Sequence, residues 1–573
     1  MLSFGKRPRE LHWHHAGPML FGDWGTSRLY VLGIAFTATG HGSLFYIALM
    51  GVVLLVVAGA YTVICRVYPE GGGVYQAARE RAPVLGVIGG LLLFADYVVT
   101  AALSALEAFH YLGIANAEWW AAGAILALGV VHFFGPRRAG MLALWIAGGA
   151  FLCYLAIAAF AAPHLSKATV FVPRVPVTEH WTNLVHIVLA LSGVEAVANM
   201  TGIMVSPLKR TVRWTIWPVA LEVVALNFVF GLAMNALPEA QLEGRTSDML
   251  RALSSAYVGP TFASVSSILF ALLLLSASST AITGMLGILF AMSRDGELPR
   301  RLARINRFGV PFQALLVATI VPIVVLAAER DVEGLAALYA IGVVGAIAIN
   351  CLSTSRTRRP VGRLERQGLL GVGLFMAAAW VTIAVEKPQA LVFACLVLGA
   401  GLLARVAFRR YREVARPVGR MPFPADAPRI LVATRGDTWP VDQGLERAAE
   451  IGAACVVALI REASFILGGV DTKALDPATD PEAARLLDYA RRAAQDRAIP
   501  IRTVYEISST PMNIIADHAV TLGVAEVHVG GSRRTRLERL ARGSPLEELR
   551  ALLPEECRLV VHRPLQGPAA EAR

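Results

Sequence analysis

Twelve largely apolar stretches, most of them about 20 residues long, dominate the first 408 residues of this chain. An α-helix of about 20 apolar residues crosses the hydrocarbon core of a bilayer with every backbone polar group bonded inside the helix. The stretches are 16–36, 43–65, 84–112, 119–134, 140–162, 183–205, 214–236, 262–293, 311–328, 335–353, 368–385 and 390–408. Charged residues make up only 17% of the chain, whereas soluble domains carry about 25%. The sequence therefore predicts an α-helical polytopic membrane protein with 12 spans.

Basic residues between the spans predict how the chain is oriented. Arginine and lysine form runs at 135–138, 208–213, 355–366 and 405–413. All four runs fall on the same side if the spans alternate. Positively charged short loops stay in the cytoplasm, so we expect both termini there. The net charge of +11 is thereby explained by short loops that orient the protein in the membrane, so we expect membrane lipids and no nucleic acid as partners.

Glycine and polar residues interrupt two of the spans. The first span contains GDWGTS at 22–27, and the sixth contains SGVEAVAN at 192–199. Interruptions at matching places in two five-span halves are typical of inverted repeats with broken helices. Backbone carbonyls freed at that depth are tolerated where they line a cavity. We therefore expect a cation site at the two breaks.

Two acidic residues lie in these breaks and are candidates for ion and proton coupling. An unpaired Asp23 carboxylate would cost about 3 kcal/mol in the bilayer, so it should face water, a cation or a proton. It could instead cap a half-helix. Tyr30 lies seven residues on, two turns along the same face of a helix. Glu195 is the corresponding acid of the sixth span.

The third span carries a polar stripe. Asp96, Thr100 and Ser104 recur every four residues, which places them on one face of a helix. Such a stripe suits a cavity wall, with Asp96 as a third candidate for proton coupling. Hydrogen bonding between neighbouring helices is the alternative.

Several of these segments resemble known transporters. FGDWGTSRLYVLG at 21–33 resembles the first-helix signature of Kup-type potassium transporters, and DYVVTAALS at 96–104 and LYAIGV at 338–343 resemble the third and tenth helices of KimA-type potassium–proton symporters. YPEGGGVY at 68–75 and FAMSRDGELPRRLARI at 290–305 are similar to segments found across the amino acid–polyamine–organocation (APC) superfamily. The resemblance implies a LeuT-like 5+5 inverted repeat in a bacterial inner membrane, with secondary active K⁺/H⁺ symport as the activity and no further cofactor.

The resemblance also implies the residues of the ion site. The substrate ligands would be Asp23, Tyr30, Asp96, Tyr97, Thr100, Ser104, Ser192 and Tyr339, with K⁺ itself at Asp23, Tyr30, Asp96 and Thr100. One departure concerns Arg28, which stands where the signature has proline. Its guanidinium could pair with Asp23 and displace a cation, or lie elsewhere on the helix or at an interface.

The alternative substrate class is amino acids, carried by an APC-type permease coupled to H⁺ or Na⁺. Such permeases resemble one another in a glycine-rich first-helix break whose bare N–H groups hold a carboxylate. Here an aspartate occupies that neighbourhood. A fixed negative charge repels a carboxylate and attracts K⁺, which favours the cation.

The sequence takes on a soluble pattern towards its C-terminus. We expect a cytoplasmic N-terminus at 1–15, a transporter domain at 16–408, a linker at 409–428, a cytoplasmic domain at 429–565 and a tail at 566–573. Short apolar runs alternate with amphipathic stretches from 429 onward, which predicts an α/β doubly wound parallel sheet.

The segment GGSRRTRLERLARGS at 530–544 resembles the phosphate-binding loop of universal stress proteins. Gly530, Gly543 and Ser544 fit that pattern, and Arg533 occupies the place of its middle glycine. The resemblance implies a regulatory nucleotide, cyclic di-AMP or ATP/AMP, and a homodimer formed through this domain. The alternative is a domain that binds no nucleotide and serves dimerisation alone.

Overall fold

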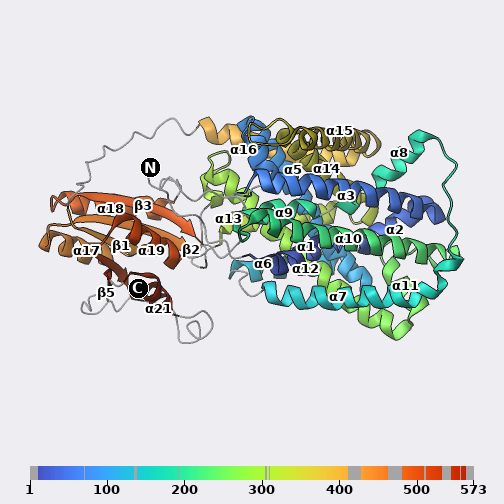
Figure 1. The fold of residues 1–573 in the computed structure, drawn as a ribbon, viewed down its shortest axis with the longest axis horizontal. Helices are drawn as coiled ribbons and strands as arrows, with labels where there is room; N and C mark the ends of the chain where they lie inside the picture. The colour runs from blue at the N-terminus through green and yellow to red at the C-terminus, as the bar shows by residue number, and fades with distance from the viewer. Residues whose placement is uncertain are drawn as a thin grey trace.

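The computed structural model describes residues 11–69, 71, 73–134, 139–191, 193–303, 306, 308, 310–410, 427–462, 480–508, 511–531, 544–554 and 556–562. Figure 1 shows a long bundle of helices with a smaller α/β domain beside one of its ends. The chain passes from the bundle to the sheet domain after α16, the last helix of the bundle.

The bundle is built from helices of very different length. Its α-helices are α1 (Trp13–Trp24), α2 (Arg28–Thr39), α3 (Ser43–Val67), α4 (Gly73–Arg79), α5 (Pro83–Tyr111), α6 (Ala117–Phe133), α7 (Ala139–Ala161), α8 (Val177–His186), α9 (Val194–Met200), α10 (Leu208–Asn235), α11 (Met249–Tyr257), α12 (Pro260–Arg294), α13 (Phe312–Ala328), α14 (Val332–Ser355), α15 (Arg363–Glu386) and α16 (Pro388–Arg410). Short 3₁₀ segments join some of them, among them η3 (Val188–Leu191) and η5 (Glu239–Gln241).

Among the described residues, eight helical segments are long and apolar enough to cross a membrane, or nine if the bent pair formed by α8 and the segment Val188–Met200 is one span. The first of the eight, Trp13–Val67, contains α1, α2 and α3. Two further apolar helices, α6 and α13, have 17 residues each. The polytopic helical fold is therefore confirmed, while the count of 12 spans stays a prediction.

The first predicted break is present in the structure. Helix α1 ends at Trp24 and α2 begins at Arg28. Between them, the Thr26 hydroxyl donates to the Asp23 carbonyl at 2.6 Å and the Ser27 hydroxyl donates to the Trp24 carbonyl at 2.8 Å. The polar residues of the break thus bond carbonyls that a helix leaves open at its C-terminal end.

The second predicted break is also present. Segment η3 ends at Leu191 and α9 begins at Val194, and a separate bend of 47° lies earlier, between α8 and the segment Val188–Met200. Gly193, just before α9, has φ +89°, a left-handed conformation that glycine adopts without steric cost.

Helix α5 is the central element of the bundle and is buried along most of its length. It packs against α4, α6, α12 and α14. Helix α14 is buried almost throughout as well. Polar residues on these two helices therefore lie inside the protein rather than against lipid.

The sheet domain has five parallel strands in the order β3-β2-β1-β4-β5. They are β1 (Arg429–Thr434), β2 (Ala454–Glu462), β3 (Ile501–Ser508), β4 (Glu526–Gly530) and β5 (Arg558–His562), and the helices are α17 (Trp439–Glu450), α18 (Pro481–Gln495), α19 (Pro511–Leu522) and α21 (Pro545–Leu552). Because β2 and β4 flank β1, the chain reverses direction across the sheet there. The prediction of a doubly wound parallel sheet is confirmed.

Candidate ion-translocation site

The two helix breaks touch each other. A methyl group placed on Gly193 would lie 2.8 Å from the Trp24 nitrogen and 2.9 Å from the Asp23 carbonyl carbon. No side chain fits at such distances, so a glycine is required here by space as well as by its φ angle. The contact brings the C-terminal turn of α1, with Asp23, against the start of α9.

Asp96 lies beside these breaks on α5. Its backbone is crossed closely by α14, since a methyl group on Gly342 would lie 2.8 Å from the Asp96 nitrogen. The Asp96 carboxyl lies close to the Glu195 carboxyl and to Tyr339, and the charge of Asp23 also acts on it, although neither Asp96 carboxyl oxygen makes a hydrogen bond among the described residues. Three acids from α1, α5 and α9 therefore share one electrostatic neighbourhood.

This acid cluster, defined as Asp23, Asp96 and Glu195, is largely shielded from solvent. Asp96 is 0% exposed and Glu195 5% exposed. Asp23 is partly exposed and interacts with the side chain of Thr280, an exposed residue of α12. Among the described residues no basic side chain bonds to any of the three carboxyls. The cluster can therefore compensate its negative charge with a bound cation, with protons or with both.

Tyr97 is held next to the cluster by neighbouring helices. Asn199 of α9 donates through Nδ2 to the Tyr97 hydroxyl at 2.7 Å. A methyl group on Gly284 of α12 would lie 2.6 Å from the Tyr97 ring. Thr100, one turn after Asp96, donates its hydroxyl to the Asp96 carbonyl at 2.9 Å. Its oxygen keeps a lone pair for a ligand, but its proton is used within α5.

Other predicted ligands lie apart from the cluster or cannot be placed. Tyr30 and Asp23 belong to different helices, α2 and α1, on either side of the turn at 25–27; that the two side chains face the same cavity stays a prediction. Ser104 is buried on α5, eight residues after Asp96, which is about 12 Å along a helix axis. One cation cannot contact both. Ser192 lies outside the described residues.

Two alternatives from the sequence are settled by the geometry. Asp23 is in the last turn of α1 and caps no helix, since the N-cap of α2 is Ser27. Arg28 neither pairs with Asp23 nor reaches an interface. It is 0% exposed and donates two hydrogen bonds to the Glu222 carboxylate of α10, at 2.8 and 2.7 Å. Its guanidinium also lies 4.6 Å from the centre of the Tyr154 ring.

Sequence reasoning overlooked part of the site. Tyr61 of α3 and Asn350 of α14 lie close to each other and to Glu195, and both are fully buried with no hydrogen bond from these polar groups among the described residues. Their signal in the sequence was a tyrosine and an amide in the middle of apolar spans. Such residues are common at helix contacts, so the sequence alone does not single them out.

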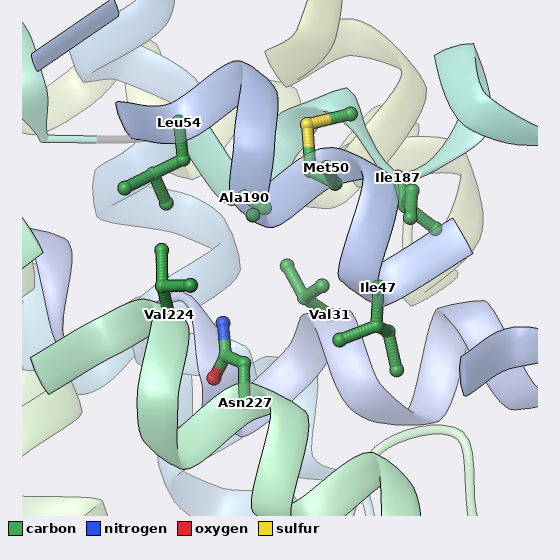
Figure 2. A pocket seen from close by; sticks show the side chains of 9 residues that line it. Val31, Ile47, Met50, Leu54, Ile187, Ala190, Val224 and Asn227 are labelled. Atoms are coloured by element: carbon green, nitrogen blue, oxygen red, sulfur yellow. The ribbon is translucent and has the colours of Figure 1, made fainter. Parts of the chain in front are cut away.

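A small cavity lies between α2, α3, α10 and the segment at 187–190. Val31, Ile47, Met50, Leu54, Ile187, Ala190, Val224 and Asn227 line it (Figure 2). Its volume of about 10 Å³ suits about one water molecule. Asn227 is the polar side chain in this apolar wall, and its Oδ1 has no hydrogen-bond partner among the described residues. The cavity is too small for a transported solute.

The candidate nucleotide site is described in part. Gly530 ends β4, which pairs with β1 at the point where the strand order reverses, the usual ligand position in doubly wound sheets. The Trp439 ring would lie 3.0 Å from a methyl group on Gly530. Ser544 is the N-cap residue of α21. Arg533 and Gly543 lie outside the described residues.

A histidine pair joins the last two strands. His528 Nδ1 lies 2.7 Å from His562 Nε2, and His528 Nε2 lies 3.1 Å from the Glu526 carboxylate, which Arg447 also binds. Burial lowers the pKa of His528, although Glu526 acts in the opposite direction. Burial and then the charge of His528 lower the pKa of His562.

Broken helices that meet at a buried acid cluster inside a polytopic bundle define a transport protein. Known proteins agree with this class: the amino acid permease family matches residues 19–405. The chain belongs to the amino acid permease family, within the APC superfamily.

Solved structures show weaker likeness. The manganese transporter of Eremococcus coleocola, in complex with an aromatic bis-isothiourea substituted compound, is 12% identical with a TM-score of 0.44, over 71% of this chain and 97% of that chain. A mutant of the same transporter gives a TM-score of 0.45 at 12% identity, over 71% and 99%. A universal stress protein in complex with cAMP is 15% identical with a TM-score of 0.19, over 24% and 97%. No curated protein matches the sequence.

Proposed function

We propose that this permease is a Kup/KimA-type secondary transporter that takes up K⁺ together with H⁺. The acid cluster carries the proposal. Asp23, Asp96 and Glu195 come from three helices to the place where both broken helices meet. A site with three carboxyls and no basic partner among the described residues attracts cations and repels anions.

Potassium would bind near the first break. Asp23 is the most accessible of the three acids. Its backbone carbonyl accepts from Thr26 and keeps a second lone pair, which could coordinate an alkali cation as carbonyls do in broken-helix transporters. Tyr97, Thr100 and Tyr339 could add oxygen ligands from α5 and α14. The choice of K⁺ over other cations rests on the sequence resemblance.

Protons would be carried by the buried pair of Asp96 and Glu195. Two neighbouring carboxyls repel each other when both are ionised, and protonation of either one relieves that repulsion. A cation arriving at Asp23 changes the balance of charge in the same cluster. Cation binding and proton binding would thereby be linked.

Arg28 does not oppose this proposal. Its charge is matched by Glu222, and the pair adds no net charge to the site. Arg28 is also the first residue of α2, a position where proline is favoured. The proline of the potassium-transporter signature and the arginine of this chain thus both suit the start of that helix.

An amino acid substrate is the second candidate, favoured by the family match itself. The α-amino group of such a substrate could bind the acid cluster, and the N–H groups of the breaks could bind its carboxylate. Asp23 in the first break disfavours this carboxylate position.

We further propose that the chain resides in a bacterial inner membrane with both termini in the cytoplasm. The sheet domain would be a universal-stress-protein-like regulator that binds cyclic di-AMP, ATP or AMP and forms a homodimer. Support comes from its doubly wound topology and from Gly530 at the edge where ligands bind.

The test is uptake into proteoliposomes containing the full-length protein. We expect Rb⁺, a K⁺ analogue, to accumulate when the outside is made acidic, and Asp23→Asn to abolish accumulation. Glu239→Gln, which removes an exposed carboxylate of η5 that does not act on the three acids, is the matched control and should transport normally. Proton-driven uptake of amino acids without any Rb⁺ uptake would refute the proposal and favour the second candidate.

A further inference from the structure

A second pocket lies at the end of the bundle, between the last turns of α3 and α14 and the short helix α4. It has a volume of about 460 Å³ and is lined by Tyr68, Ala77, Glu80, Arg81, Arg356, Thr357 and Arg358. This is far larger than the cavity of Figure 2. Polar and charged side chains make up most of its wall.

The charges around this pocket do not cancel. Glu80 is bonded to Arg359 at 2.6 Å, so its carboxylate is already neutralised. Arg81 donates to a neutral backbone carbonyl, that of Arg356, at 2.8 Å. Among the described residues Arg356 and Arg358 have no carboxylate partner. Three guanidinium groups therefore line one cavity without a carboxylate partner among the described residues.

A buried hydroxyl also lines this pocket. Tyr68 is 2% exposed, and its hydroxyl has no hydrogen bond of normal geometry among the described residues. The Arg359 guanidinium lies over the Tyr68 ring, 4.7 Å from the ring centre. An unsatisfied buried donor beside three cationic groups is suited to an acceptor-rich anion.

The position of the pocket indicates where such an anion comes from. Tyr68 directly follows α3, and Arg356 directly follows α14. Both helices belong to segments that are long and apolar enough to cross a membrane. The pocket is therefore at the depth where lipid headgroups lie. Basic pockets between helix ends are a known mode of binding for phosphate-bearing headgroups.

We infer that this arginine pocket, formed by Tyr68, Arg81, Arg356 and Arg358, binds a phosphate group, supplied by the headgroup of an anionic phospholipid. Guanidinium groups bind phosphate oxygens in pairs, and the volume accommodates a headgroup. The bound phosphate bridges the segment after α4 and the end of α14. Since α14 also carries Tyr339, occupancy would brace a helix of the ion site.

Full-length protein in nanodiscs provides the test. We compare phosphatidylcholine alone with phosphatidylcholine containing phosphatidylglycerol, and count retained anionic lipids by native mass spectrometry. The pocket variant is Arg81→Gln/Arg356→Gln/Arg358→Gln. The matched control, Lys209→Gln/Arg210→Gln/Arg213→Gln, removes three exposed basic residues from the first turns of α10.

A basic residue near an anionic surface contributes about fivefold to lipid affinity, so the pocket variant should bind phosphatidylglycerol at least about tenfold more weakly than the wild type. The control, whose three basic residues lie outside this pocket, should lose less. Tyr68→Phe should weaken binding in the same direction while leaving every charge in place. Equal binding by the pocket variant and the control would overturn the inference.

The source of the phosphate is tested separately. Millimolar inorganic phosphate or glycerol 3-phosphate is added to nanodiscs that contain phosphatidylglycerol. Retention of the lipid supports a headgroup site. Displacement of the lipid by either soluble anion, in the wild type but not in the pocket variant, would overturn the lipid assignment and leave a soluble phosphate site.

Discussion

Removal of one partner of the Arg28–Glu222 pair is the sharpest test of the structure. Glu222→Gln keeps the size of the side chain and removes its charge. The Arg28 guanidinium, 0% exposed, would then be buried without a carboxylate. The reciprocal change, Arg28→Met, leaves the Glu222 carboxylate, which is 16% exposed and can be hydrated in part.

The two single changes should therefore differ in cost. Loss of one partner from a buried ion pair destabilises a protein by about 3–5 kcal/mol, and Glu222→Gln should fall in this range. Arg28→Met should cost less, about 1–3 kcal/mol. The double variant leaves neither charge behind, and buried pairs replaced by neutral side chains are often neutral in stability. We expect the double variant to be more stable than Glu222→Gln alone.

Thermal unfolding of the detergent-solubilised full-length protein, followed by tryptophan fluorescence, measures these differences. Glu222→Gln should lower Tm by roughly 5–10 °C. Arg245→Met, which breaks an ion pair that is 51% and 16% exposed, is the control and should change stability by less than about 1 kcal/mol. If the two single effects simply add in the double variant, Arg28 and Glu222 do not interact and the reasoning is refuted.

Three further predictions concern other parts of the chain. Glu195→Gln should abolish Rb⁺ uptake driven by a proton gradient. Rb⁺ exchange at equal concentrations on the two sides should remain, because exchange needs no proton transfer. Loss of uptake and of exchange in a folded variant would contradict the role of Glu195 in coupling. Gly342→Ala should destabilise the bundle by about 1–3 kcal/mol, since its methyl group would lie 2.8 Å from a backbone nitrogen, whereas Gly371→Ala, with open space at its methyl position, should be neutral or stabilising in the same thermal assay. The pKa values of His528 and His562 are lowered in the folded protein, so the unfolded chain takes up protons first and the sheet domain should lose stability as the pH falls below about 6.5. Hydrogen exchange of β4 and β5 in the full-length protein, corrected for the intrinsic rate, measures this, and unchanged protection at pH 5.5 would contradict it.

The sequence was most informative where a local pattern sets the structure. The breaks at Gly25 and Gly193 were predicted because glycine next to polar residues weakens a helix inside an apolar span. The parallel sheet was predicted from strands that alternate with helices. Both patterns depend on residues that are near each other in the chain.

Contacts between distant segments could not be read from the sequence. Arg28 and Glu222 form a hydrogen bond although they are 194 positions apart in the sequence. The residues around either one do not indicate its partner. The expected face shared by Asp23 and Tyr30 assumed one continuous helix, which the predicted break itself excludes. Composition also does not set the number of spans, because α6 and α13 are apolar but have 17 residues each.

The close contact of Gly193 with the backbone at Asp23 bears on whether K⁺ or H⁺ can cross the membrane uncoupled from the other ion. Since no atoms separate the two breaks, α1 cannot swing away from the bundle without altering the environment of Glu195 at the start of α9. In the proposed symporter, opening the gate for K⁺ and exposing the proton carrier would then be one mechanical event. Slippage, in which either ion crosses alone, should increase when this contact is loosened.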